Sequence, residues 1–151
     1  MPNRSDPRGL VLPLSSAMLS LLLAMPSVSV SQDSPAATAQ AAAKELKSPV
    51  PVTKDSISAG RKLFATYCTR CHGNDGKAQL DVVANATDLT APIVYSHGTS
   101  PGEIYRSISD GAGLAMPPFK TALTKEEDRW HLVNFVRNLW PSDKRPPVEG
   151  G

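Results

Sequence analysis

The chain has 151 residues, of which 40% are hydrophobic and 5% aromatic, and its 16 basic residues nearly balance its 14 acidic ones. This length allows one compact domain but not two ordinary ones. The nearly neutral balance gives no reason to expect a nucleic-acid partner. The sequence also contains no glycine-rich phosphate loop and no internal repeat, so the usual signals of an enzyme are missing.

The first 31 residues have the pattern of an export signal. Arg4 and Arg8 give a positively charged start, an apolar stretch spans residues 10–25, and small residues follow it. Prolines interrupt the apolar stretch and end it at Pro26, which makes it short for a membrane span. We therefore expect residues 1–31 to direct the chain to the periplasm or to another exported location, either as a cleaved signal or as a retained membrane anchor.

Residues 32–53 change in composition to Ala, Pro, Ser, Gln and Thr, with few large apolar side chains. Such a composition cannot bury a core, so it predicts a flexible linker. Alanine favours a helix over residues 36–46, but these residues have no apolar stripe with which a helix could dock. The ordered domain is expected to span residues 54–141, and the Pro- and Gly-rich residues 142–151 are expected to form a disordered tail.

Apolar residues at helical spacing predict a helix that starts near residue 56 and runs directly into Cys68. Gly60 lies on the same face of this helix as Phe64, although glycine lowers helix stability relative to alanine. A costly glycine on a buried face indicates that another backbone approaches closely there.

Two further helices are predicted, and no segment alternates apolar and polar residues as a strand would. One begins at Ser100, where the following proline and Glu103 complete a capping box. The other begins with a similar pattern at Thr124 and ends at Pro141, and a loop at residues 111–121 separates the two. The expected fold class is all-α, with three to five short helices around a cofactor.

Cys68 and Cys71 are the two cysteines of the chain, and His72 follows the second one directly. This spacing is the pattern for attaching a c-type haem, because each sulfur can add to a haem vinyl group while the imidazole reaches the iron. The motif therefore predicts one covalently bound haem c. The alternatives are a dithiol redox centre, a plain disulfide, or a zinc site whose two histidines come from His72, His97 and His131, although the histidine spacing resembles no known finger.

A second axial ligand must come from elsewhere in the chain. Three of the four methionines lie within residues 1–31, so Met116 is the methionine that remains in the mature domain. Pro117 and Pro118 follow it and restrict the local backbone, which suits a soft axial ligand. Ligation by His and Met closes both axial positions and favours electron transfer over oxygen chemistry. The alternatives are His97 as the ligand and a core-packing role for Met116.

These landmarks resemble a small class I monohaem cytochrome c. The segments GRKLFATYCTRCHG at residues 60–73 and GLAMPPF at residues 113–119, followed by the amphipathic last helix, occur in the order typical of that family. The resemblance covers about residues 54–141, somewhat over half of the chain. It implies the fold of that family wrapped around a single covalent haem.

The resemblance also implies the roles of individual residues. Cys68 and Cys71 would form the haem thioethers, and His72 and Met116 would be the axial ligands of the iron. The first and last helices would cross at a contact made by one glycine and three apolar side chains: Gly60, Phe64, Leu132 and Phe135. Relatives often place a proline before Asp-Leu-Thr, and its carbonyl accepts the proton of the ligand histidine. This chain has Asn-Ala-Thr at residues 85–87 instead, so the acceptor for His72 is left open.

We therefore expect an exported monohaem c-type cytochrome that carries single electrons between redox proteins and is not an enzyme. Its donor and acceptor would bind transiently through small contacts. One alternative is a haem subunit of a larger periplasmic dehydrogenase or oxidase complex. Another is a haem-based small-ligand sensor or enzyme in which Met116 leaves the iron.

Overall fold

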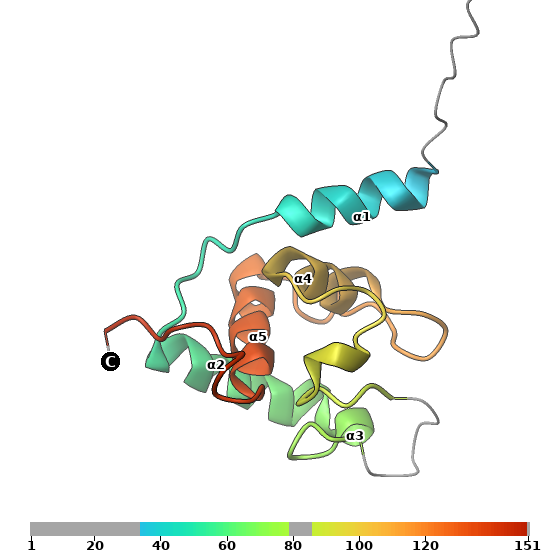
Figure 1. Ribbon diagram of the computed structural model, residues 1–151. Coiled ribbons are helices and arrows are strands. Elements are labelled where there is room, and N and C mark those ends of the chain that lie inside the picture. Colours follow the sequence, from blue (N-terminus) through green and yellow to red (C-terminus); the bar gives the residue numbers. More distant parts are fainter. Residues whose placement is uncertain (1–33, 79–85, 151) are drawn as a thin grey trace, which may run out of the picture. The chain divides into compact units, whose positions relative to one another are not determined.

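The computed structural model describes residues 34–78 and 86–150, so the expected export signal lies outside the described part. The described helices are, in order, α1 (Pro35–Glu45), α2 (Lys54–Tyr67), α3 (Thr69–His72), the 3-10 turn η1 (Pro92–Val94), α4 (Pro101–Asp110) and α5 (Glu126–Asn138) (Figure 1). In this part, isolated β-bridges take the place of a sheet, so the fold is all-α as expected. None of the described helices has the length and hydropathy to cross a membrane.

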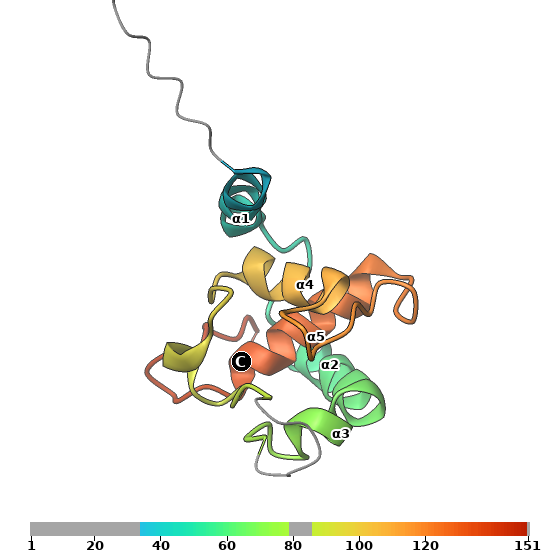
Figure 2. The ribbon, with the colours of Figure 1, turned by 90° about the vertical axis from the view of Figure 1, so that its right-hand side faces the viewer.

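Helices α2 and α5 cross and make the most extensive helix contact of the described part (Figure 1, Figure 2). A Cβ atom at Gly60 would lie 2.1 Å from the carbonyl oxygen of His131 and 2.7 Å from Cβ of Phe135, so the contact requires a glycine. Phe64 packs on Phe135 with ring centroids 5.1 Å apart, and Leu132 is fully buried. The crossing expected from the sequence is confirmed.

The core lies between α2, α4 and α5. Its buried apolar side chains come from all three helices, from the loop before α5 and from the turn after it: Phe64, Ile104, Tyr105, Ile108, Leu123, Trp130, Leu132, Val133, Phe135, Val136 and Trp140. Arg129 is buried beside them, and its guanidinium donates hydrogen bonds to the hydroxyl of Tyr105 and to the carbonyl of Leu123. The buried charge is therefore hydrogen-bonded, as burial of a charge requires.

The N-termini of α4 and α5 are capped differently. The predicted capping box at α4 is present: the Ser100 hydroxyl accepts from the Glu103 amide, and the Glu103 carboxylate accepts from the Ser100 amide. The prediction that Thr124 caps α5 was wrong, because the N-cap of α5 is Lys125 and its side chain makes no cap hydrogen bond. Three acidic residues in the first turn of α5 complement the positive end of the helix dipole instead.

Helix α1 lies within the stretch that the sequence predicts as a linker, and it packs against α4 (Figure 1, Figure 2). Ala43 of α1 is 5% exposed. A Cβ atom at Gly102 of α4 would lie 2.1 Å from the carbonyl oxygen of Ala43, so the two backbones meet directly. Because an alanine and a glycine make this contact, α1 docks without the wide apolar stripe that periodicity detects.

The described part of the C-terminal segment returns to the start of α2. The amide of Glu149 donates to the carbonyl of Val52 at 2.7 Å, and Thr53 and Glu149 form a parallel β-bridge. Closer to α5, the amides of Lys144 and Arg145 both donate to the carbonyl of Pro141. The residues at the start of α2 therefore meet the segment that follows α5.

Candidate cofactor site

The two cysteines and His72 lie where α2 passes into α3. The amide of Cys68 donates to the carbonyl of Phe64 at 2.9 Å, which ends α2. The carbonyl of Cys68 accepts from the amides of Cys71 and His72 at 3.1 and 3.0 Å. These bonds keep the three side chains within about one helical turn of each other. Both thiols are free and half-buried.

The main chain of Thr87 orients the ring of His72. Nδ1 of His72 lies 3.0 Å from the Thr87 carbonyl oxygen, and since a carbonyl only accepts, Nδ1 carries the proton. Nε2 is then unprotonated and free to bind a metal. Burial lowers the pKa of His72 against the opposing effect of the Thr87 hydrogen bond, so the ring is neutral. The Thr87 carbonyl is therefore the acceptor for the His72 ring proton, which the sequence alone did not identify.

The thiol of Cys68 has a raised pKa, which is the opposite of what a dithiol redox centre needs. Burial, followed by the effect of the neighbouring Cys71, raises the pKa of Cys68 to about 12. A reactive dithiol needs a lowered thiol pKa. The zinc alternative has no support either: within the described ranges, no three His, Cys, Asp or Glu side chains are grouped to hold a metal ion. His131 lies at the α2 and α5 contact, where its Nδ1 is 2.9 Å from Oγ of Ser56.

Met116 lies at the base of a closed loop. Its amide and carbonyl form an antiparallel β-bridge with Ala112, at N to O distances of 3.4 and 3.1 Å. Gly111 has a φ of +86°, and a Cβ there would lie 2.7 Å from the Met116 carbonyl oxygen. The main chain of Met116 is thus fixed, while its side chain packs against the core and Leu114 at the tip of the loop is fully exposed.

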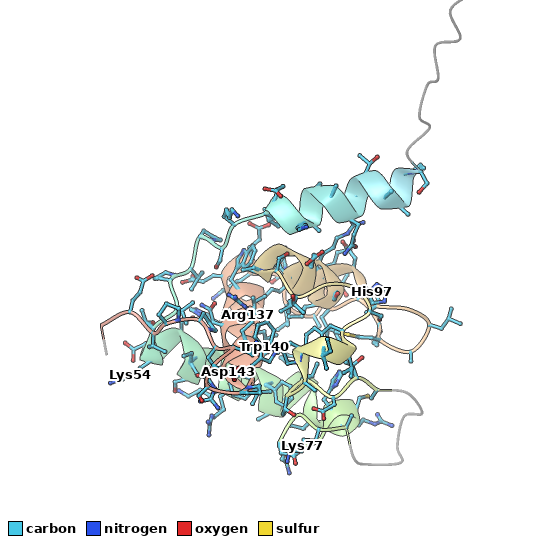
Figure 3. The ribbon with its side chains drawn as sticks, viewed as in Figure 1. Lys54, Lys77, His97, Arg137, Trp140 and Asp143 are labelled. Carbon is cyan, nitrogen blue, oxygen red and sulfur yellow. The ribbon has the colours of Figure 1, made fainter. Side chains whose placement is uncertain are left out.

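Two adjoining cavities lie between the Cys68–His72 segment and Met116. Their volumes are about 650 and 1060 Å³, counting space open to solvent. Cys68, His72 and Met116 line both cavities, and Cys71 lines the larger one. His97, on the loop between η1 and α4, lines both as well (Figure 3). The smaller cavity has mainly apolar walls, formed by Phe64, Leu89, Ile104, Ile108, Leu132 and Val136. The fold therefore brings together all four residues singled out by the sequence, together with His97.

Tyr95 also lines the smaller cavity, and sequence reasoning missed it. Its hydroxyl donates to the Leu89 carbonyl at 2.9 Å and accepts from Nε1 of Trp140 at 3.2 Å, with the two rings edge to face. Burial raises the pKa of Tyr95 to about 12, against the lowering effect of the Trp140 hydrogen bond and with a further rise from Asp88. A tyrosine in a loop without periodicity gave no signal that could have placed it here.

A protein-family model described as cytochrome C oxidase, cbb3-type, subunit III matches residues 55–136, which is more than half of the chain. These residues include α2, α3, η1 and α4 and nearly all of α5. Helix α1 lies outside the match.

Two curated proteins are similar to more than half of the chain. The chain is 30% identical over 84 residues to the cbb3-type cytochrome c oxidase subunit CcoP of Rubrivivax gelatinosus, which covers 56% of this chain and 26% of CcoP. It is 30% identical over 95 residues to cytochrome c-L of Methylorubrum extorquens, which covers 63% of this chain and 46% of that protein. The chain thus spans about a quarter and just under half of these two curated relatives.

A solved structure shows the same fold. The crystal structure of cytochrome CL from Methylophaga aminisulfidivorans MPT superposes with a TM-score of 0.51 at 24% sequence identity. The superposition covers 65% of this chain and 71% of that one.

Proposed function

The chain belongs to the c-type cytochrome family matched at residues 55–136, and we propose that it is an exported monohaem carrier of single electrons between redox proteins. The family implies a covalent haem c, which supplies reversible one-electron chemistry at its iron when bound. In this proposal Cys68 and Cys71 form the thioethers, and His72 and Met116 ligate the iron.

The residues around the cavities fit this cofactor. Mainly apolar walls suit the large apolar surface of a haem. The donors at the cavities include the thiols of Cys68 and Cys71, the imidazole of His72 and the thioether of Met116, which are the ligand types that hold haem in c-type cytochromes. No charged side chain lines either cavity among the described residues, so an apolar group meets no unpaired charge there.

The orientation of His72 is the main support for this assignment. Because its Nδ1 donates to Thr87, the nitrogen free to bind iron is Nε2. A haem-ligating histidine needs such a partner for its other nitrogen, since the bond fixes the ring and raises the basicity of the ligand. The acceptor is a main-chain carbonyl, so the orientation does not depend on the side chain at residue 87.

His72 and Met116 would both bind the iron and leave it no open position for an outside ligand, which suits a carrier rather than a catalyst. Tyr67 and Leu114 line the larger cavity and are exposed. They form an apolar rim where a redox partner can approach the cofactor closely. Such encounters bury little surface and separate quickly.

A second candidate role is that of a haem subunit within a larger oxidase or dehydrogenase complex. The relative CcoP is by its name an oxidase subunit, and this chain matches only 26% of its length. A partner that stays bound to the chain through purification would support this role over that of a diffusing carrier.

Residues 1–31 are proposed to direct export, as a cleaved signal or as an anchor, and residues 54–141 to hold the haem. The N-terminal residue of the purified protein decides between the two fates of the signal. An N-terminus near residue 30 indicates cleavage, whereas Met1 indicates a retained anchor.

The proposed function is tested by expressing the full chain with haem-attachment machinery and extracting it with acid acetone. We expect the haem to stay with the wild type and to extract from the double variant Cys68→Ser, Cys71→Ser. Haem that extracts from the wild type would refute covalent attachment. The reduced protein should also fail to bind carbon monoxide, whereas rapid binding would favour the ligand-sensing alternative.

A further inference from the structure

Helix α1 covers the N-terminal part of α4, which forms one wall of the cavities. The contact is close, since Ala43 of α1 lies against Gly102 of α4. Ile104 and Ile108 of the same α4 helix line the smaller cavity. Helix α1 lies outside residues 55–136 that match the family model, so the family match does not account for this contact.

Gln40 extends the contact from α4 to the loop that precedes it. Its Nε2 donates to the carbonyl oxygen of His97 at 2.8 Å and to Oε1 of Glu103 at 3.0 Å. The other oxygen of Glu103 accepts from the Ser100 amide in the capping box. The Glu103 carboxylate also occupies the position that a Cβ would take at Gly98, whose φ is +93°. Gln40 therefore joins the helix cap and residues 97–98 in one cluster.

The loop at residues 96–99 depends on this cluster. Within residues 34–78 and 86–150, the bond from Gln40 to His97 is the one hydrogen bond that the loop makes. Ser96 and His97 line both cavities, and Gly98 lines the smaller one. The same cavities are lined by Met116, so the loop forms part of the wall beside the proposed axial ligand.

We propose that Gln40 is a positioning residue for the haem site, and that α1 holds residues 96–98 against the cavity through it. In this arrangement the wall stays closed and limits the access of outside ligands to the iron on the Met116 side. The inference deepens the proposed function and rests on it, because it assumes a haem in the cavity. Losing one such hydrogen bond should shift the equilibrium between open and closed wall about 2- to 10-fold toward open.

The test compares Gln40→Ala with Thr38→Ala in the haem-loaded protein. Thr38 is exposed on the same helix, and its side chain makes no hydrogen bond, so both variants put alanine into α1 and keep the helix favourable. The readout is the rate at which imidazole changes the absorption spectrum of the oxidised protein. Gln40→Ala should raise this rate about 2- to 10-fold, and Thr38→Ala should leave it unchanged.

Two additions keep the result clear. Gly102→Ala should push α1 away from α4 and raise the imidazole rate at least as much as Gln40→Ala. If the Gly102→Ala variant does not fold, the comparison of Gln40→Ala with Thr38→Ala tests the proposal. Amide hydrogen exchange at residues 96–98 should also accelerate in Gln40→Ala and not in Thr38→Ala. Equal imidazole rates in wild type and Gln40→Ala, with the haem retained in acid acetone, would overturn the proposed role of Gln40. The proposed function of the chain would then still stand. Haem lost from the wild type would contradict the proposed function.

Discussion

Asp88 accepts two hydrogen bonds from Thr90 through a single carboxylate oxygen. Oδ1 of Asp88 lies 2.8 Å from the amide nitrogen of Thr90 and 2.7 Å from its hydroxyl. Such a side-chain turn fixes the local main chain. The residue before it is Thr87, whose carbonyl orients His72, so the rigidity of this turn is transmitted to the proposed iron ligand.

Replacing Asp88 should therefore change the haem potential. Asp88→Asn removes a negative charge but keeps the acceptor, whereas Asp88→Ala also removes the turn and loosens the Thr87 carbonyl. A weaker bond to His72 makes the ligand less basic, which destabilises the oxidised iron. We expect Asp88→Ala to have a potential higher than that of Asp88→Asn by on the order of tens of millivolts in a redox titration. Equal potentials would show that the turn does not act on His72.

Met116→Ala should remove the far-red sulfur-to-iron absorption band and lower the reduction potential. Axial ligands tune haem potentials over about 0.8 V, so a fall on the order of 0.1 V is expected. Thr121→Ala is the matched control, because Thr121 is exposed in the same loop of residues 111–121 and lines neither cavity, so both quantities should stay unchanged. A wild-type spectrum in Met116→Ala would eliminate this ligand, and His97 would be the next residue to replace.

Gly60→Ala should destabilise the fold. Alanine favours an exposed helix over glycine by roughly 1 kcal/mol, but here the added Cβ meets the His131 carbonyl carbon and oxygen and the Phe135 side chain. Overpacking of this kind costs about 1–3 kcal/mol, so the clash should outweigh the gain in propensity. Denaturant unfolding measures the difference, with the exposed Ser58→Ala on the same helix as the control. A Gly60→Ala variant more stable than wild type would show that the helices can separate at little cost.

Tyr95 should make the stability depend on alkaline pH. Burial raises its pKa from 10.0 to about 12 in the folded protein, so the unfolded chain loses the phenol proton first. The stabilisation is fully present below pH 10 and is lost as the pH rises toward 12. We expect wild type to lose unfolding free energy more steeply than Tyr95→Phe across this interval. If the plots of unfolding free energy against pH were parallel for the two proteins, the loss of stability would come from the titration of other groups.

The features that the sequence predicted correctly are encoded by neighbouring residues or by regular spacing. The capping box needs only Ser100 and Glu103, which are three positions apart. The crossing of α2 and α5 could be anticipated because Gly60 is unfavourable in a helix unless a backbone lies against it. Local chemistry of this kind is visible before any tertiary contact is known.

The features that could not be predicted arise from main-chain contacts between distant segments. Thr87 acts through its carbonyl, which every residue possesses, so its identity carries no signal. Helix α1 docks through Ala43 and Gly102, two residues too small to form an apolar stripe. Thr124 has the composition of a cap, but α5 begins two residues later, at Glu126, and sequence patterns place helix ends only to within a few residues.

The hydrogen bond between Glu149 and Val52 has a consequence for how the domain can be connected to other polypeptides. Because the residues just before α2 and the segment after α5 meet there, a short linker could join residues 52 and 149 in a form of the domain that starts at α2, and new ends could be opened at the exposed tip near Leu114. Such a circular permutant would keep the contacts among α2, α4 and α5, whereas α1 and its contact with α4 would be left out. For the same reason the domain can be spliced as one unit into a surface loop of a larger protein, and tension between its two attachment points would act on this terminal contact and bypass the cofactor cavity.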